Sequence, residues 1–236
     1  MKIQWIPLES NPEVMNEWAE KAGLDTSQYR LQDVYGLDEE LLAFVPQPVK
    51  ALILIFPDAD EHVMKRLAKD SQLDPTGAAL DPSLTYVTQT IGNACGTMAL
   101  LHSLMNSNVP LYPDSPLKRF IAECKGKTPE ERAKLLEETD AFASIHLEAS
   151  LAGQTAAPPA EERPDFHYTS FVLFPSAKAD EGTLLVELDG DRGSPIVHGA
   201  SVDLLQDGAE VIKQQYIGSG ATNNFGIIAL VPHTEF

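Results

Sequence analysis

Cysteine is scarce in this sequence, because its 236 residues include only Cys95 and Cys124. Two cysteines do not suit a disulfide framework of the kind that staples small secreted domains, and they exclude a cysteine-rich zinc site. In an intracellular chain that also carries histidines and acids, a single thiol is instead a candidate nucleophile.

Long hydrophobic runs are missing as well. The longest, residues 51–56, is far too short to cross a bilayer. Residues 1–7 carry one lysine and no long apolar stretch, so we expect no secretory signal and no membrane association. We therefore expect the chain in the cytoplasm, with the nucleus as an alternative location.

Basic residues are few. The sequence has 17 Lys and Arg against 35 Asp and Glu, which gives a net charge of −18. Because this field would repel a phosphate backbone, we do not expect nucleic-acid binding. A basic partner or a basic substrate tail would be attracted. Solubility alone also accounts for such a charge, so both explanations stay open.

The chain has enough apolar residues, 43% of the total, to bury one core, and we expect a single domain over residues 1–236. An alanine- and proline-rich stretch, about 149–164, has little to bury and is predicted to be a long mobile loop. Helical patterns dominate the first half and strand patterns the second, so the predicted class is α+β. The expected helices cover residues 11–21, 38–44, 57–69, 93–106, 115–123, 128–148 and 202–216, and the expected strands cover residues 49–56, 166–174, 183–188, 195–198 and 225–231.

The most informative stretch is Gln89-Thr-Ile-Gly-Asn-Ala-Cys-Gly-Thr97, which places Cys95 in the first turn of a helix after a Gly-Asn turn. Backbone N–H groups and the helix dipole favour an anion at such a position, and therefore a thiolate. Gln89, expected at a strand–helix junction, could donate to an oxyanion, with the backbone N–H of Cys95 as the second donor. A buried structural cysteine and a glutamine that caps a turn are the alternatives.

A nucleophilic cysteine needs a base, and His167 is the best placed of the six histidines, because it enters an apolar strand directly after the long loop. A buried imidazole must find a partner there, although the backbone could supply it. His102 lies about 10 Å along the same helix as Cys95, too far for direct proton transfer. His62, His146 and His233 are expected at the surface.

The acid that orients the base is expected on a neighbouring strand, and Asp189 ends the next one. Asp189-Gly190 is also an ordinary turn pair, so its chemistry is not established by position alone. Local reasoning thus yields a plausible Cys–His–Asp set.

These residues resemble the active-site signature of the ubiquitin carboxyl-terminal hydrolase family of cysteine peptidases, in its short single-domain type. The similarity extends over essentially the whole chain. It includes the opening Trp5-Ile-Pro-Leu-Glu-Ser-Asn-Pro-Glu13, then Phe166-His-Tyr168 and Leu188-Asp-Gly190, and finally Asn224-Phe-Gly-Ile-Ile-Ala-Leu230.

The resemblance implies roles for four residues: Cys95 as nucleophile, His167 as general base and then acid, Asp189 as the group that orients the imidazole, and Gln89 as oxyanion donor. It also implies a papain-like fold, with a central antiparallel sheet flanked by helices and a knotted backbone. The loop at about 149–164 corresponds to the crossover loop of the family, which arches over the active site. No metal and no organic cofactor is expected.

The implied activity is removal of small or flexible adducts from the C-terminal glycine of ubiquitin through a thioester intermediate. Leu8, Glu9, Glu13 and Asp33 occupy positions that resemble ubiquitin contacts of the family, and the protein is expected to be a monomer. Two alternatives stay open: a non-catalytic ubiquitin-binding module, and a peptidase for a ubiquitin-like modifier such as Nedd8.

Overall fold

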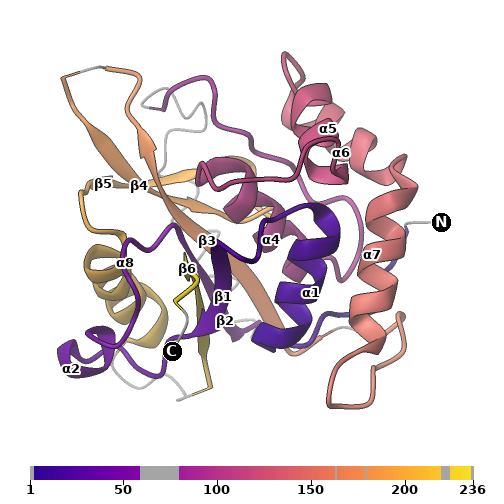
Figure 1. The fold of residues 1–236 in the computed structure, drawn as a ribbon, viewed down its shortest axis with the longest axis horizontal. Helices are drawn as coiled ribbons and strands as arrows, with labels where there is room; N and C mark the ends of the chain where they lie inside the picture. The colour runs from indigo at the N-terminus through magenta and orange to yellow at the C-terminus, as the bar shows by residue number, and fades with distance from the viewer. Residues whose placement is uncertain (1–2, 59–79, 163, 179, 219–223, 235–236) are drawn as a thin grey trace.

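The central element of the computed structural model, which describes residues 3–58, 80–162, 164–178, 180–218 and 224–234, is one antiparallel sheet. Its six strands follow the order β1-β6-β2-β3-β4-β5 (Figure 1). Each pair of neighbouring strands is antiparallel. The strands are β1 (Tyr29–Asp33), β2 (Ala51–Pro57), β3 (Phe166–Pro175), β4 (Thr183–Leu188), β5 (Ile196–Ala200) and β6 (Gly226–Pro232).

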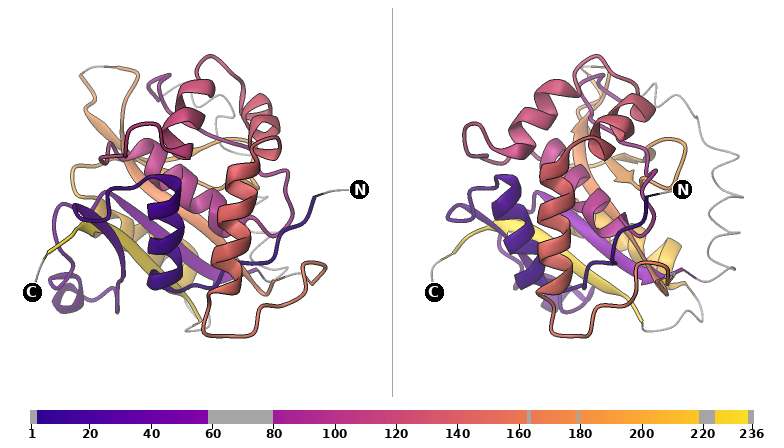
Figure 2. Two further views of the ribbon diagram at one scale, coloured as in Figure 1. Left: turned by 45° about the vertical axis from the view of Figure 1, so that its right-hand side comes forward. Right: turned by 90° about the vertical axis from the view of Figure 1, so that its right-hand side faces the viewer.

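Helices cover both faces of this sheet, as the two further views in Figure 2 show. One core joins the sheet to α1 (Pro12–Ala22), α4 (Cys95–Asn106), α5 (Pro116–Glu123), α6 (Pro129–Glu137) and α7 (Asp140–Leu151). The other joins it to α2 (Glu39–Leu42) and α8 (Leu204–Ile212). In the described parts of the chain, no helix is long and apolar enough to span a bilayer.

Strand β2 shows why its sequence is apolar without alternation. Its residues Ala51, Ile53 and Ile55 contribute to one core, whereas Leu52, Leu54 and Phe56 contribute to the other. Successive side chains of a strand point to opposite faces, so a strand covered on both sides needs apolar residues at every position. The prediction of a doubly covered strand is confirmed.

The first helix begins and ends where the sequence predicts. The side chain of Asn11 accepts a hydrogen bond from the Glu13 N–H, and Pro12 occupies the first turn. The helix stops at Gly23, whose φ of 126° a side chain would rarely adopt. A Cβ there would also lie 2.2 Å from the Cβ of Ser115, so both the backbone conformation and the lack of space require glycine at this position.

Residues 84–91 are extended but form no strand, which corrects the expected strand–helix junction at Gln89. Side chains of α4 take the place of a partner strand. The Asn106 amide pairs with the N–H and carbonyl groups of Thr85 at 2.8 and 2.9 Å, and the Val87 N–H donates to His102 Nε2 at 3.1 Å. A sequence pattern does not reveal which groups satisfy the backbone of a segment. A segment that pairs with another strand and a segment that pairs with side chains therefore have the same pattern.

Other differences are smaller. The helix expected over residues 128–148 is two helices, α6 and α7, which are separated at Glu138 and Thr139. The helix expected over residues 202–216 ends in a π-helical turn, Lys213–Ile217. Strand β1 was not predicted, since it is short and mostly polar, with Leu31 as its one buried residue. The helix expected over residues 57–69 lies largely outside the described residues, and Pro57 itself belongs to β2.

Candidate active site

Cys95 is the first residue of α4, as the sequence predicts, and only 5% of its surface is exposed. The chain enters the helix through Asn93, which has a positive φ of 60°. The helical hydrogen-bond pattern begins at once, because the Met98 N–H donates to the Ala94 carbonyl at 2.8 Å. The Cys95 sulfur therefore lies beside backbone N–H groups that favour negative charge.

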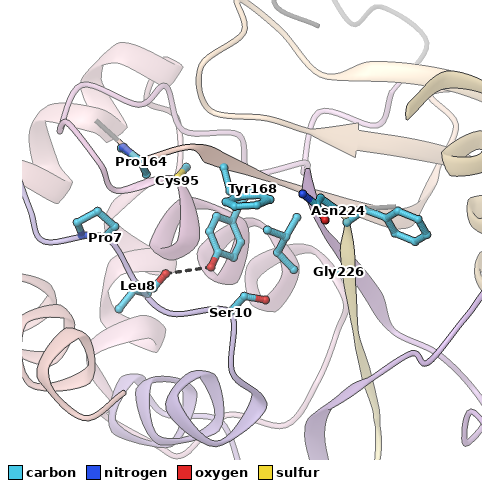
Figure 3. Close-up of a pocket in the computed structure, with 11 residues that line it drawn as sticks. Pro7, Leu8, Ser10, Cys95, Pro164, Tyr168, Asn224 and Gly226 are labelled. Atoms are coloured by element: carbon cyan, nitrogen blue, oxygen red, sulfur yellow. Dashed lines mark hydrogen bonds between the residues drawn. The ribbon is translucent and has the colours of Figure 1, made fainter. Parts of the chain in front are cut away.

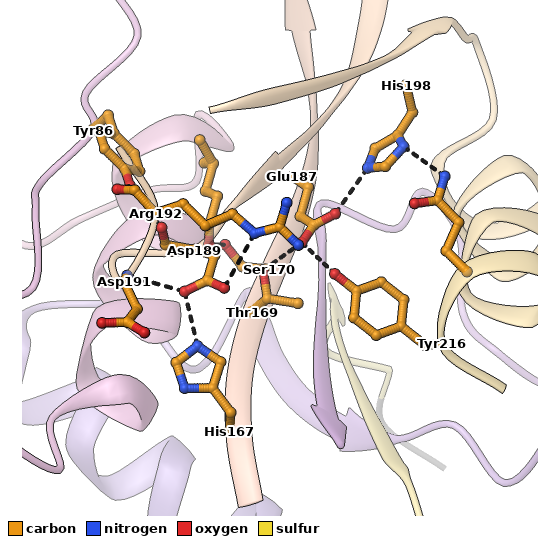
Figure 4. A network of polar contacts seen from close by, with 12 residues as sticks. Tyr86, His167, Thr169, Ser170, Glu187, Asp189, Asp191, Arg192, His198 and Tyr216 are labelled. Carbon is orange, nitrogen blue, oxygen red and sulfur yellow. Dashed lines mark hydrogen bonds and ion pairs between the residues drawn. The ribbon is translucent and has the colours of Figure 1, made fainter. Parts of the chain in front are cut away.

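His167 and Asp189 meet across two adjacent strands. His167 is the second residue of β3, Asp189 follows β4 directly, and both side chains are buried. The distance from His167 Nε2 to Asp189 Oδ1 is 2.8 Å (Figure 4). Because Nε2 is engaged with the carboxylate, the other ring nitrogen, Nδ1, is left to interact with Cys95.

The charge state of His167 follows from its neighbours. Burial by itself lowers the pKa of His167, but the Asp189 carboxylate and a hydrogen bond with Cys95 outweigh it and raise the pKa to about 10. The imidazole is thus protonated at neutral pH, and a cation beside the sulfur stabilises a thiolate. The geometry joins the three residues that sequence reasoning had proposed as a set.

The Asp189 turn is held rigidly by groups that sequence analysis did not find. The Tyr86 hydroxyl donates to the carbonyls of both Asp189 and Arg192, at 2.6 and 2.5 Å. The Asp191 N–H donates to Asp189 Oδ1 at 3.0 Å. This oxygen therefore accepts two hydrogen bonds, which fix the plane of the carboxylate against the imidazole.

Behind this turn lies a second buried carboxylate, Glu187, which is only 1% exposed. Arg192 bridges the two acids, with Nε 3.5 Å from Asp189 Oδ2 and one terminal nitrogen 3.5 Å from Glu187 Oε1. Glu187 also binds His198 Nε2 at 2.9 Å and accepts a short hydrogen bond from the Tyr216 hydroxyl (Figure 4). Burial raises the pKa of Glu187, but the hydrogen bond from His198 and the charge of Arg192 lower it overall. Glu187 is therefore held ionised inside the protein.

Gln89 packs directly against the Asp189 turn. Its N–H donates to the Gly190 carbonyl at 2.7 Å, and a Cβ on Gly190 would lie 3.1 Å from the Gln89 Cβ. A side chain at position 190 would therefore press against Gln89. The buried Oε1 of Gln89 has no hydrogen-bond partner among the described residues, so the amide is not committed to a structural role.

An apolar pocket of about 460 Å³ opens beside Cys95 (Figure 3). Residues from both ends of the chain form its walls, and Tyr168 joins them because its hydroxyl donates to the Leu8 carbonyl at 2.9 Å. The lining residues are Pro7, Leu8, Ser10, Ile55, Cys95, Pro164, Phe166, Tyr168, Asn224, Phe225 and Gly226.

The loop that follows α7 is tied to this pocket at two points. Near its start, Thr155 donates from its N–H and its hydroxyl to Glu9 Oε2, at 2.9 and 2.6 Å. Near its end, the Asn93 amide donates to the carbonyls of Ala160 and Glu162, at 2.7 and 3.1 Å. Both anchors adjoin the site, because Glu9 lies between two pocket residues and Asn93 precedes Cys95 by two positions.

The four expected partner contacts have different environments. Leu8 is 4% exposed, and its side chain packs on Gly96 at the start of α4. Glu9 holds the loop as described above, whereas Glu13 is exposed in the first turn of α1. Asp33 is exposed at the end of β1, where it pairs with Ile228, two residues from Gly226 in the pocket wall. Of the four, Leu8 lines the pocket and Glu9 adjoins it in the chain, whereas Glu13 and Asp33 are not among its lining residues.

The remaining histidines do not compete with His167. His102 is fully buried and accepts from the Val87 N–H, and burial lowers its pKa to about 4. His146 is 2% exposed, so the expectation of a surface position was wrong. It lies between the Thr97 hydroxyl and the Ile6 carbonyl, at 2.8 and 2.7 Å, and burial lowers its pKa to about 4. His62 lies outside the described residues.

A cysteine at a helix N-terminus that faces a histidine–aspartate pair on an antiparallel sheet is the arrangement of a papain-like cysteine peptidase. Comparison with known proteins agrees with this class. A model of the family described as "Ubiquitin carboxyl-terminal hydrolase, family 1" matches residues 5–217. The chain belongs to this family, and it is a thiol-dependent ubiquitin hydrolase.

Among its relatives, a ubiquitin carboxyl-terminal hydrolase of Aplysia californica is 41% identical over 215 residues, which cover 89% of this chain and 94% of the relative. Ubiquitin carboxyl-terminal hydrolase 3 of Arabidopsis thaliana is 38% identical over 98% of this chain and 95% of the relative. The catalytic domain of Trichinella spiralis UCH37, solved with ubiquitin vinyl methyl ester, shares the fold at a TM-score of 0.72 and 21% identity, over 98% of this chain and 96% of that one. The knotted path of the backbone stays a prediction.

Proposed function

We propose that Cys95 is the nucleophile that attacks the carbonyl carbon of the C-terminal glycine of ubiquitin. The observation that carries this assignment is the 2.8 Å contact between His167 and Asp189, because it presents the second ring nitrogen to Cys95. Attack forms a carbon–sulfur bond and a tetrahedral oxyanion. The backbone N–H of Cys95 and the amide of Gln89 are the donors for this oxyanion.

The His167 proton then goes to the leaving amine or thiol as its bond to the glycine carbonyl breaks, which leaves a thioester on Cys95. In the second half of the reaction, His167 takes a proton from water as the water oxygen attacks the thioester. The carbon–sulfur bond then breaks, which releases ubiquitin and leaves the Cys95 thiolate beside the protonated His167. Asp189 stays ionised throughout and holds the imidazole in one orientation.

The surroundings of the pocket favour the tail of ubiquitin, which contains arginines and ends in two glycines. The pocket beside Cys95 is apolar, Glu9 adjoins it in the chain, and Glu13 and Asp33 are exposed acids. We assign these acids to the arginines of the tail and Leu8 to its apolar residues. Nedd8 is the alternative substrate.

We further propose that the loop expected at about 149–164, which in the structure follows the end of α7 at Leu151, limits the leaving group to small or flexible adducts. The support is its attachment through Thr155 to Glu9 and through Ala160 to Asn93, next to residues of the pocket. A folded leaving group would have to displace these hydrogen bonds, whereas a fluorophore or an unfolded peptide would not.

The test uses three substrates of increasing leaving-group size: ubiquitin with a C-terminal fluorophore, ubiquitin with an unstructured peptide extension, and a folded ubiquitin dimer. We expect kcat/KM to be sharply lower only for the folded dimer, and not for the peptide extension. Equal cleavage of all three would refute the size limit. Ubiquitin vinyl methyl ester gives an independent readout, because mass spectrometry should place its adduct on Cys95. Competition between ubiquitin and Nedd8 fluorophore substrates separates the two modifiers by kcat/KM.

A further inference from the structure

A second groove lies at the opposite end of α4 from Cys95. Its volume is about 830 Å³, and residues from the start of β1, the end of α4 and the helix α5 line it. Its floor is apolar and is formed by Leu104, Met105, Val109, Leu111 and Ile121. Met105, Leu111 and Ile121 are only partly buried, so apolar surface is open to a partner here.

The rim of this groove is basic in a chain that is otherwise strongly acidic. Lys118 and Lys125 line it, and both are exposed. Residues 116–127 contain four bases and one acid, a local net charge of +3 within a chain of net charge −18. Lys50 adds a further cation, because its Nζ lies 5.9 Å from the ring centre of Tyr29, which also lines the groove. Asp25 is bound to a residue of this groove, because its carboxylate accepts from Gln28 as well as from Ser27.

We propose that this basic-rimmed groove docks an acidic, amphipathic segment of a partner protein. An apolar floor between positive rims is complementary to a helix or extended peptide that carries leucine-like side chains on one face and carboxylates beside them. Such a segment would be repelled over most of a surface with net charge −18, so the groove is the place where charge and apolar contact act together.

The groove and the active site can be occupied at once. Met105 lies ten residues after Cys95 on the same helix, which places it about 15 Å away along the axis at 1.5 Å per residue. The pocket beside Cys95 and this groove share no lining residue. A basic substrate tail is attracted to the acids around Cys95, whereas an acidic segment is attracted to the far end of α4. The proposal therefore does not depend on the chemistry at Cys95.

The experiment measures fluorescence anisotropy of a labelled synthetic peptide, with leucines at helical spacing and glutamates on both flanks, added to the full chain. Binding is expected, and its affinity should weaken as salt is raised. A peptide with glutamine in place of each glutamate tests the charge contribution and should bind about tenfold more weakly. The fluorescent ubiquitin substrate should be hydrolysed at the same rate with the acidic peptide bound.

Matched variants locate the binding. The double variant Lys118→Glu/Lys125→Glu is expected to weaken binding about tenfold or more. Lys178→Glu/Lys213→Glu changes the net charge by the same amount at exposed positions elsewhere and should bind as the parent does. Ala122→Gln narrows the groove at an exposed helix position without changing charge, and should weaken binding as well.

Four outcomes would overturn the proposal. If both double variants lost affinity for the peptide equally, only the net charge of the chain would determine binding. If the glutamate and glutamine peptides bound equally well, charge would make no contribution and binding would be a nonspecific apolar contact. Inhibition of ubiquitin hydrolysis in competition with substrate would place the peptide in the active site. If decanoate filled the groove and the peptide did not bind, the occupant would be a fatty acid anion and the assignment to a protein segment would be wrong.

Discussion

Replacing Arg192 by methionine should destabilise the protein strongly, because Arg192 is the buried cation between Asp189 and Glu187. Its nitrogens lie 3.5 Å from an oxygen of each acid, and its side chain is 6% exposed. Methionine keeps much of the volume but leaves two buried carboxylates without that cation. Removing one partner of a buried ion pair typically costs about 3–5 kcal/mol. Because His167 and His198 still contact the acids, we expect a value near the lower end, about 3 kcal/mol.

For a chain of this length, each kcal/mol lowers Tm by about 2–4 °C, so the expected decrease is about 6–12 °C. Thermal unfolding followed by circular dichroism measures it, and Arg192→Lys, which keeps the charge, should lose much less. The pKa of Glu187 is lowered in the folded protein, so its contribution is present above its unfolded pKa and is lost as pH falls through the folded value. The deficit of Arg192→Met should therefore be largest at neutral pH and shrink under acid conditions.

A double-mutant cycle identifies the cause. Glu187→Gln removes one of the two stranded charges, so Arg192→Met should cost less in that background than in the parent chain. If Arg192→Met unfolded at the same temperature as the parent at neutral pH, or if the two substitutions were additive, the reasoning about this network would be refuted.

Three further predictions concern the residues around Cys95. Asp189→Asn should lower kcat/KM by about 10⁴-fold, because the imidazole would be misoriented. NMR titration should show the pKa of His167 falling from about 10, since the carboxylate would no longer oppose the effect of burial. An unchanged pKa of His167 would contradict this reasoning. Gln89→Ala should reduce kcat by about 10²–10³-fold with little change in KM, and a change confined to KM would argue against oxyanion stabilisation. Thr155→Val removes the hydroxyl contact with Glu9. The kcat/KM for the folded ubiquitin dimer should therefore rise relative to the kcat/KM for the fluorophore substrate. A constant ratio of the two would exclude this contact as a restraint on leaving-group size.

The parts of the fold that the sequence predicts best are those that local patterns determine. The apolar run that forms β2 and the capping residues of α1 have local causes, and both are found as expected. Residues 84–91 were misassigned because side chains from α4 satisfy their backbone, a long-range arrangement that periodicity does not encode. Strand β1 was missed because it is a short, mostly polar segment whose position depends on pairing with β6.

The candidate active site also has features that local sequence patterns predict and features that depend on long-range folding. The Cys95 turn is local. The pairing of His167 with Asp189 was proposed from the order of two strands and is also implied by the family resemblance, and the structure brings the two side chains to 2.8 Å. Arg192 was not identified as a functional residue, since nothing local distinguishes a buried arginine from an exposed one. Its position between two acids arises from the folding of β4 and the following turn. His146 was misjudged for the same reason, because its partners come from α4 and from the N-terminal segment.

The most direct test of the central claim is release of a fluorophore from the C-terminus of ubiquitin by the intact chain, by Cys95→Ala and by Cys124→Ala. Cys124 is a matched control, because it is a second buried thiol, 1% exposed, and burial raises its pKa to about 11. The account predicts turnover by the intact chain and by Cys124→Ala, and none by Cys95→Ala, which should still bind ubiquitin. Normal turnover by Cys95→Ala would contradict the assignment of the nucleophile.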